Sequence, residues 1–213
     1  MLNLIAVALT LLLDWHPNVN HEPLYKKRCF EAEHIELNIV ESAPADLSIR
    51  LGPQLLRAMD RGEELDLIAV LVNRPLQGFC TPANKPIQSV SDIKVVGVKP
   101  RGTTASILHV FSKDIICIPS RDFDEIDVLG GCFENVEPFQ FNEPMRFISI
   151  MELGVPHYPE LLVVSKKGLL DEGTKQAFCR ALKRSIGEEY SLEGLKPLRD
   201  WMKAQGVIHE PIP

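Results

Sequence analysis

The sequence predicts an α/β protein whose strands are covered by helices. Short runs rich in Val, Ile and Leu recur along the 213 residues, and most are bounded by Gly, Pro or Asp. Runs of this kind are typical of strands buried on both faces of a sheet. Near the end of the chain, apolar residues recur at three- and four-residue intervals, which indicates two amphipathic helices. The combination predicts an α/β fold.

The first element expected is a buried strand within Met1–Leu13, an apolar run broken only by Asn3 and Thr10. The alternative is a secretion signal, because the run is long enough for a signal core. No Lys or Arg precedes the run and no small-x-small cleavage site follows it, which favours the strand. A membrane span would need about 20 apolar residues, so none is expected.

A helix is expected over Leu51–Arg61, with Leu51, Leu55, Leu56 and Met59 on its buried face. Glu36–Val40 alternates between polar and apolar residues, which predicts a second strand. Short apolar runs predict the remaining strands, which are Leu65–Val72, Val95–Val98, Ile115–Ile118, Ile126–Leu129 and Leu161–Val164.

Two helices are predicted at the C-terminal end. The first carries an apolar stripe of Ala177, Phe178, Ala181, Leu182 and Ile186. Its basic residues lie largely off that stripe and predict a solvated face rather than an anion site: Lys175, Arg180, Lys183 and Arg184. The second helix has apolar residues at Leu192, Leu195, Leu198, Trp201 and Met202 and stops at Gly206.

Composition excludes several classes of protein. The formal net charge is −6 and the chain has no basic block, so nucleic acid is not an expected partner. The five cysteines are odd in number and never spaced as CxxC, namely Cys29, Cys80, Cys117, Cys132 and Cys179. This pattern argues against a disulfide framework and a thiolate zinc site, and it favours a cytoplasmic location.

The segment Leu13–Tyr25 is the strongest candidate for a functional loop. It places aromatic, imidazole, amide and carboxylate side chains directly after the first strand. Ligands bind at the carboxyl ends of strands in open α/β sheets. The alternative is a rigid turn fixed by Pro17 and Pro23. A metal site at His16 and His21 is not expected, because no further ligand has suitable spacing.

Two later segments are candidates for ligand contacts. Gly97–Ser106 predicts a strand, a turn and a helix start, where Gly102 allows close backbone approach and Thr103 or Thr104 caps the helix. Free N–H groups there favour a phosphate or carboxylate, although a cap without a ligand is the alternative.

In Gly130–Glu137, an extended backbone would place the side chains of Asn135 and Glu137 on one side. The alternative is that both are surface residues paired with Lys or Arg.

These segments together resemble a known family. The family contains periplasmic pyrimidine-binding subunits of thiamine-precursor transporters and the fungal thiamine-pyrimidine synthases. Its signature is matched by Asp14, Trp15, Pro17, Asn18, His21, Leu24 and Tyr25. Val96–Thr104, Gly130–Glu137 and Glu152–Ser165 follow in the family's order.

The resemblance implies a two-lobed fold of the periplasmic-binding-protein type II kind, in a shortened form. The first lobe would comprise residues 1–75 and 160–213, and the second residues 76–159. A ligand would lie in the cleft between the lobes.

The resemblance also implies that the protein binds a small heteroaromatic metabolite, a thiamine-pyrimidine precursor. Trp15 and Tyr25 would stack on the ring, and Asn135 and Glu137 would bind its polar edge, since an aminopyrimidine presents a donor beside ring acceptors. The full set of expected ligand-binding residues is Trp15, Asn18, His21, Tyr25, Gly102, Thr103, Thr104, Asn135 and Glu137. A transporter partner is expected only if the protein is exported to the periplasm or secreted.

Two alternatives to simple binding stay open. One is 4-amino-5-hydroxymethyl-2-methylpyrimidine phosphate synthase, in which the fungal enzymes use their own histidine, a lysine-held pyridoxal phosphate and an iron-associated cysteine run. The stretch Leu51–Arg61 has no Lys-xxx-His and no two cysteines lie within ten residues, so we expect no catalytic residue and no cofactor. The other is a degenerate member that binds nothing, because the chain is shorter than the family pattern after Asp46 and between Thr104 and Gly130.

Overall fold

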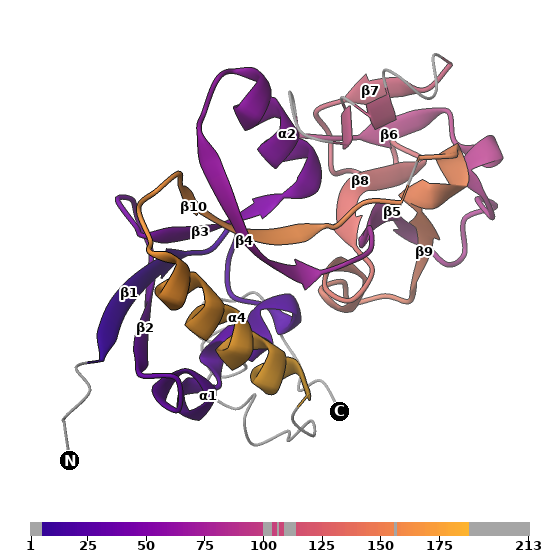
Figure 1. Ribbon diagram of the computed structural model, residues 1–213. Helices are drawn as coiled ribbons and strands as arrows, with labels where there is room; N and C mark the ends of the chain where they lie inside the picture. The colour runs from indigo at the N-terminus through magenta and orange to yellow at the C-terminus, as the bar shows by residue number, and fades with distance from the viewer. Residues whose placement is uncertain (1–5, 100–103, 106, 109–113, 156, 188–213) are drawn as a thin grey trace. The chain divides into compact units, whose positions relative to one another are not determined.

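The chain forms two compact units, each with its own β-sheet (Figure 1). The computed structural model describes residues 6–99, 104–105, 107–108, 114–155 and 157–187. Unit 1 contains the described residues up to Asn73 and from Pro159 onward, and unit 2 is Arg74–Tyr158. The chain therefore enters unit 2 once and returns once, and each unit is described by itself.

The sheet of unit 1 has five strands. They are β1 (Val7–Leu12), β2 (Ile35–Val40), β3 (Leu47–Leu51), β4 (Leu65–Val72) and β10 (Leu161–Lys166), in the order β2-β1-β3-β10-β4. β1 is parallel to both β2 and β3, whereas β10 is antiparallel to β3 and β4. The strand expected within the N-terminal apolar run is thus confirmed over β1, in the interior of the sheet.

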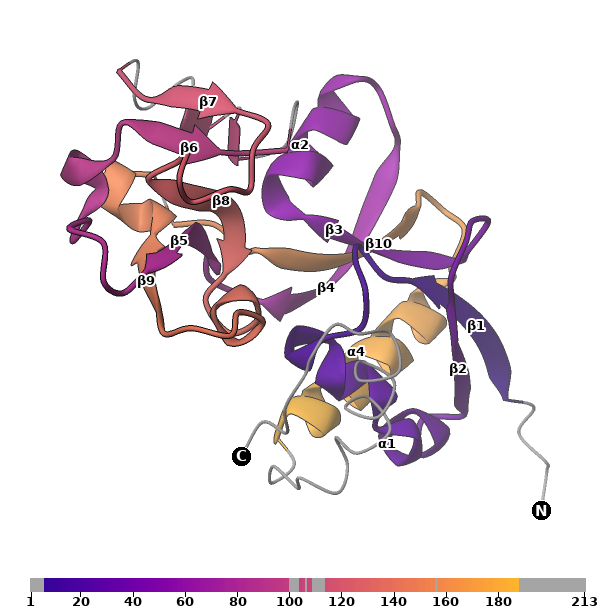
Figure 2. The same ribbon diagram turned by 180° about the vertical axis from the view of Figure 1, so that it is seen from behind.

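Helices cover both faces of this sheet (Figure 2). The helices α1 (Lys27–Glu31) and α4 (Glu172–Gly187) pack together over one face, where the rings of Phe30 and Phe178 lie with centroids 5.4 Å apart. On the other face α2 (Gly52–Asp60) packs through Leu55. Strand β10 alternates between the two cores, as a strand with two buried faces must.

The predicted helix within Leu51–Arg61 is confirmed as α2, but its predicted buried face is partly wrong. Leu55 and Ala58 are buried, whereas Leu56 is 69% exposed and Met59 is 53% exposed. The buried positions are three apart and form a narrow stripe, because the core beneath α2 consists of few residues. Apolar spacing alone therefore predicted a wider buried face for this helix than the structure has.

The first C-terminal helix is confirmed as α4, with Phe178, Ala181 and Leu182 buried. Arg180 and Arg184 lie on its surface, and each forms a 2.9 Å ion pair with Glu33. The second predicted helix, over Leu192–Met202, lies outside the described residues.

The sheet of unit 2 repeats the topology of unit 1. Its strands are β5 (Gln77–Pro82), β6 (Val95–Gly97), β7 (Ile116–Ile118), β8 (Val128–Phe133) and β9 (Met145–Ser149), in the order β7-β6-β8-β5-β9. β6 is parallel to β7 and β8, and β5 is antiparallel to β8 and β9. The fourth strand in each order is antiparallel to its neighbours: β10 in unit 1 and β5 in unit 2. Each is the first strand that the chain forms after it passes from one unit to the other. The predicted two-lobed α/β fold is confirmed.

Short 3-10 segments complete the described chain. They are η1 (Val19–Tyr25), η2 (Val90–Asp92), η3 (Glu137–Phe139) and η4 (Ile150–Leu153). Among the described residues, none of the helices combines the length and the apolar character that crossing a membrane requires.

Candidate functional site

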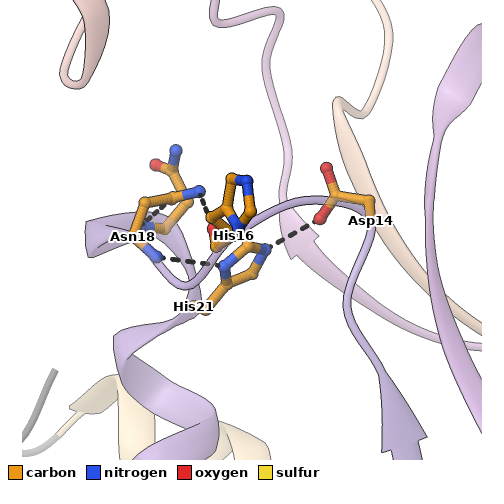
Figure 3. A network of polar contacts seen from close by, with 5 residues as sticks. Asp14, His16, Asn18 and His21 are labelled. Atoms are coloured by element: carbon orange, nitrogen blue, oxygen red, sulfur yellow. Dashed lines mark hydrogen bonds and ion pairs between the residues drawn. The ribbon is translucent and has the colours of Figure 1, made fainter. Parts of the chain in front are cut away.

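The loop after β1 is organised around the buried side chain of His21 (Figure 3). The His21 Nε2 atom lies 2.8 Å from Asp14 Oδ1, and its Nδ1 accepts the backbone N–H of Asn18 at 3.3 Å. Because Nδ1 acts as an acceptor, the neutral ring carries its proton on Nε2 and donates it to Asp14. One imidazole thus joins the start of the loop to its 3-10 helix.

Asn18 fixes the other side of the same loop. Its Oδ1 accepts the backbone N–H of Asn20 at 3.0 Å, so it caps η1, and its Nδ2 donates to the His16 carbonyl oxygen at 3.1 Å. Its carbonyl oxygen also accepts the His21 backbone N–H at 2.9 Å. The two predicted ligand residues Asn18 and His21 therefore hold the loop backbone, which is the geometry of a rigid turn.

Trp15 is the exposed aromatic residue on this fixed loop. Its side chain is 56% exposed, and its ring meets that of His16 edge-on, with centroids 5.3 Å apart and planes at 72°. The flanking Asp14 is tied to His21, so the backbone that carries Trp15 is held at the carboxyl end of β1. A planar ligand could stack on this indole at low entropic cost.

Tyr25 ends η1 and packs against the core of unit 1. Burial raises the pKa of Tyr25 to about 12. Its ring is thus a half-buried wall, whereas Trp15 is an open platform.

We expect Tyr25 to ionise about two units above an ordinary tyrosine. The folded pKa exceeds the unfolded one, so the stability that this group contributes is complete below about pH 10 and lost as the pH rises toward 12. The measurement is phenolate absorbance against pH for wild type and Tyr25→Phe. A difference curve centred near pH 10 would contradict the burial described.

In unit 2 the helical residue Thr104 packs on the glycines of β8. The Thr104 hydroxyl, which is buried, donates to Gln77 Oε1 at 3.2 Å. A Cβ atom on Gly130 would lie 3.1 Å from Thr104 Cγ2, and one on Gly131 would lie 3.2 Å from Thr104 Oγ1. Two segments singled out separately in the sequence are thus brought together, while Gly102 and Thr103 lie outside the described residues.

Gln77 is a buried polar partner of Thr104 that sequence reasoning did not identify. It begins β5 and is buried beside Thr104. The available signal was a long polar side chain in a segment between two apolar runs, which by itself does not distinguish a buried amide from a loop residue.

The backbone at Asn135 and Glu137 is not extended. β8 ends at Phe133, a turn follows, and η3 begins at Glu137. The two-residue spacing therefore does not place both side chains on one side, as an extended backbone would.

The Glu137 carboxylate closes its own loop. Its Oε2 accepts the backbone N–H of Phe133 at 2.5 Å. Burial raises the pKa of Glu137, while that hydrogen bond and the charge of Arg121 act in the opposite direction. A carboxylate can accept several hydrogen bonds, so this bond leaves Glu137 with acceptor capacity.

The His21 and Lys26 side chains are bonded within unit 1. Among the described residues, no three His, Cys, Asp or Glu side chains gather as a metal-binding set. Both ring nitrogens of His21 are bonded inside the protein. Lys26 lies 3.2 Å from Glu22 and donates to the Ser185 carbonyl oxygen at 2.8 Å, so it is engaged in structure.

Comparison with known sequences identifies related proteins. Residues 31–191 match the family described as "NMT1/THI5 like". A Haemophilus influenzae protein named "Putative thiamine biosynthesis protein" is 26% identical over an alignment of 211 residues. The alignment covers 83% of this chain and 67% of that protein.

Solved structures share the fold. The periplasmic aliphatic sulphonate binding protein SsuA of Escherichia coli matches with TM-score 0.57 and 10% identity, over 96% of this chain and 94% of that one. The amino acid transporter substrate-binding protein AbpA of Streptococcus pneumoniae, bound to L-arginine, matches with TM-score 0.57 and 13% identity, over 95% and 97%. HinK, a LysR family transcriptional regulator of Pseudomonas aeruginosa, matches with TM-score 0.54 and 10% identity, over 86% of this chain and 72% of that one. At these identities the matches establish the fold alone. 

Proposed function

We propose that this chain, which belongs to the NMT1/THI5-like family, binds a small heteroaromatic metabolite, namely a thiamine-pyrimidine precursor. The observation that carries the proposal is the exposed indole of Trp15 on a loop held by the buried Asp14–His21 contact. Support also comes from the name of the Haemophilus influenzae relative, which refers to thiamine biosynthesis.

In this proposal the residues of unit 1 divide into two roles. Trp15 stacks on the pyrimidine ring, and Tyr25 supplies a wall. Asn18 and His21 are positioning residues, because their polar atoms are bonded to the loop itself. Base–aromatic stacking contributes about 1–3 kcal/mol, enough to make one exposed indole decisive for a small ligand.

The residues proposed for unit 2 supply polar contacts. Asn135 and Glu137 bind exocyclic and ring nitrogen atoms, and Gly102, Thr103 and Thr104 bind an anionic substituent. Support comes from the packing of Thr104 on Gly130 and Gly131, which brings two of the segments that match the family signature together.

We expect Trp15→Ala to weaken binding of the hydroxymethyl form of the thiamine pyrimidine at least tenfold, or about 1.4 kcal/mol. The reason is loss of the stacking surface, and calorimetry measures the dissociation constant. Trp15→Phe should retain part of the affinity, and Leu56→Ala, which truncates an exposed apolar residue on α2, should retain all of it. Equal dissociation constants for Trp15→Ala and wild type would contradict the stacking role.

Glu137→Gln is expected to weaken binding of the same ligand roughly five- to a hundredfold. The amide puts a donor where the carboxylate accepts, and a mispaired buried contact costs about 1–3 kcal/mol. The amide oxygen can still accept the Phe133 N–H, so the loop should keep its shape. Glu134→Gln, in the same loop, is the matched control. An unchanged dissociation constant for Glu137→Gln would assign that carboxylate to loop closure only.

The location proposed with this function is the periplasm or another extracytoplasmic compartment, with a transporter as partner. Support comes from the fold match to SsuA, which is named as periplasmic. The cytoplasmic location expected from the cysteine pattern has no support among these matches.

Native mass spectrometry of protein purified from its own host tests the proposed function. A retained ligand with the mass of an aminopyrimidine is the expected result. A retained ligand without a heteroaromatic ring would contradict the proposal.

A further inference from the structure

Two cysteines meet in the core of unit 2. Cys80 lies on β5 and Cys132 on β8, and both are buried in one apolar cluster with Ile126 and Leu129. The Cys80 thiol is a neighbour that raises the pKa of Cys132, and the Cys132 thiol donates to the Leu129 carbonyl oxygen at 3.3 Å. The pair is 52 residues apart in sequence (132 − 80), so its proximity arises only from folding.

A bulge in β8 explains why the thiols share one face of the sheet. Cys80 pairs with Leu129, and Cys132 pairs with Gly78, with a register shift between the two pairs. Gly131, at φ 83°, is the extra residue in β8. In a regular strand, residues three apart face opposite sides, but the bulge turns Cys132 to the side of Leu129 and Cys80.

The other three cysteines lie elsewhere. Cys29 and Cys179 belong to unit 1, where Cys179 donates to the Ile68 carbonyl oxygen at 3.0 Å. Cys117 is exposed on β7, and β6 separates that strand from β8. Among the described residues, the contact between Cys80 and Cys132 is therefore specific to this pair.

We propose that Cys80 and Cys132 form an intramolecular disulfide when the protein meets a small disulfide oxidant such as oxidised glutathione. The two S–H bonds break and one S–S bond forms, while the released two electrons and two protons convert the oxidant into two thiols. The new bond ties β5 to β8 beside the Gly131 bulge. This inference is independent of the proposed ligand.

The pair is suited to slow, structural oxidation rather than to rapid exchange. The neighbouring Cys80 thiol and burial raise the pKa of the Cys132 thiol. Because the thiolate is the attacking species, exchange requires unit 2 to open or to be still folding. Once formed, the disulfide would stabilise the unit by restricting its unfolded chain.

The test refolds the full chain from denaturant in glutathione buffers of increasing oxidised fraction. Free thiols are alkylated with a light reagent, and cysteines released by later reduction are alkylated with a heavy one. After reduction, peptide mass spectrometry should show Cys80 and Cys132 changing to the heavy label together. Before reduction, the digest should contain a disulfide-linked peptide whose mass is two hydrogens below the sum of the two free peptides. The thermal midpoint of unfolding should rise with that linkage.

Cys132→Ser should abolish the linked peptide, whereas Cys29→Ser should leave it unchanged. If Cys132→Ser does not fold, the linkage map of the wild-type chain still decides. Light labelling of both Cys80 and Cys132 after refolding in the most oxidising buffer would overturn the proposal, as would a linkage that joins either one to another cysteine.

Discussion

Gly78→Ala is expected to disrupt the sheet of unit 2. A Cβ atom on Gly78 would lie 2.2 Å from the Ile148 carbonyl oxygen and 2.5 Å from Phe147 Cζ. That oxygen belongs to β9, which pairs with β5, so it cannot move away without breaking the pairing. Overpacking costs about 1–3 kcal/mol and occasionally more, and a clash with backbone places this variant at about 3 kcal/mol or above.

Hydrogen exchange locates this effect better than fluorescence, because neither tryptophan lies within Arg74–Tyr158. Peptides from β5, β8 and β9 should lose protection in Gly78→Ala. The matched control is Gly173→Ala in α4, where the nearest neighbour of the new Cβ is a side-chain atom, Asp171 Oδ1, at 3.1 Å. Unchanged protection in β5 and β9 would show that the close approach at Gly78 is absent.

His21→Ala is expected to destabilise unit 1 by about 3 kcal/mol and to abolish binding of the thiamine pyrimidine. The change leaves a cavity at a fully buried position, and it removes the N–H donor from the nearly buried Asp14 carboxylate. A buried group that loses its partner costs about 1–3 kcal/mol, to which the cavity adds. Trp15 would also lose its fixed backbone.

Asp14→Asn is the matched control, because an amide oxygen can still accept the His21 Nε2–H. We expect it to lose about 1 kcal/mol or less and to keep most of the affinity. Denaturant unfolding and calorimetry measure the two effects. If His21→Ala bound the ligand as tightly as wild type, the loop would not depend on its buried imidazole.

Most of the strands that sequence reasoning identified are continuous apolar runs. β1, β4 and β10 are such runs, and β10 is buried on both faces as that pattern predicts. β5 was missed although it is buried throughout, because Gly78 and Pro82 within it are residues that usually mark turns. Apolar composition therefore fails to identify a buried strand where close approach of a neighbouring strand requires glycine, as it does at Gly78.

The candidate site could be predicted only in part for a similar reason. The signature pointed to the loop after β1, but which side chains face outward depends on hydrogen bonds that spacing does not encode. Asn18 and His21 turn inward to the loop backbone, and Trp15 remains exposed. At Glu137 the prediction assumed an extended backbone, and the 3-10 turn of η3 replaced it.

Calorimetric titration of the folded wild-type chain with the hydroxymethyl form of the thiamine pyrimidine tests the central claim most directly. The account predicts a dissociation constant in the micromolar range or tighter, which corresponds to about 8 kcal/mol. Absence of both heat and thermal stabilisation at millimolar ligand would contradict it.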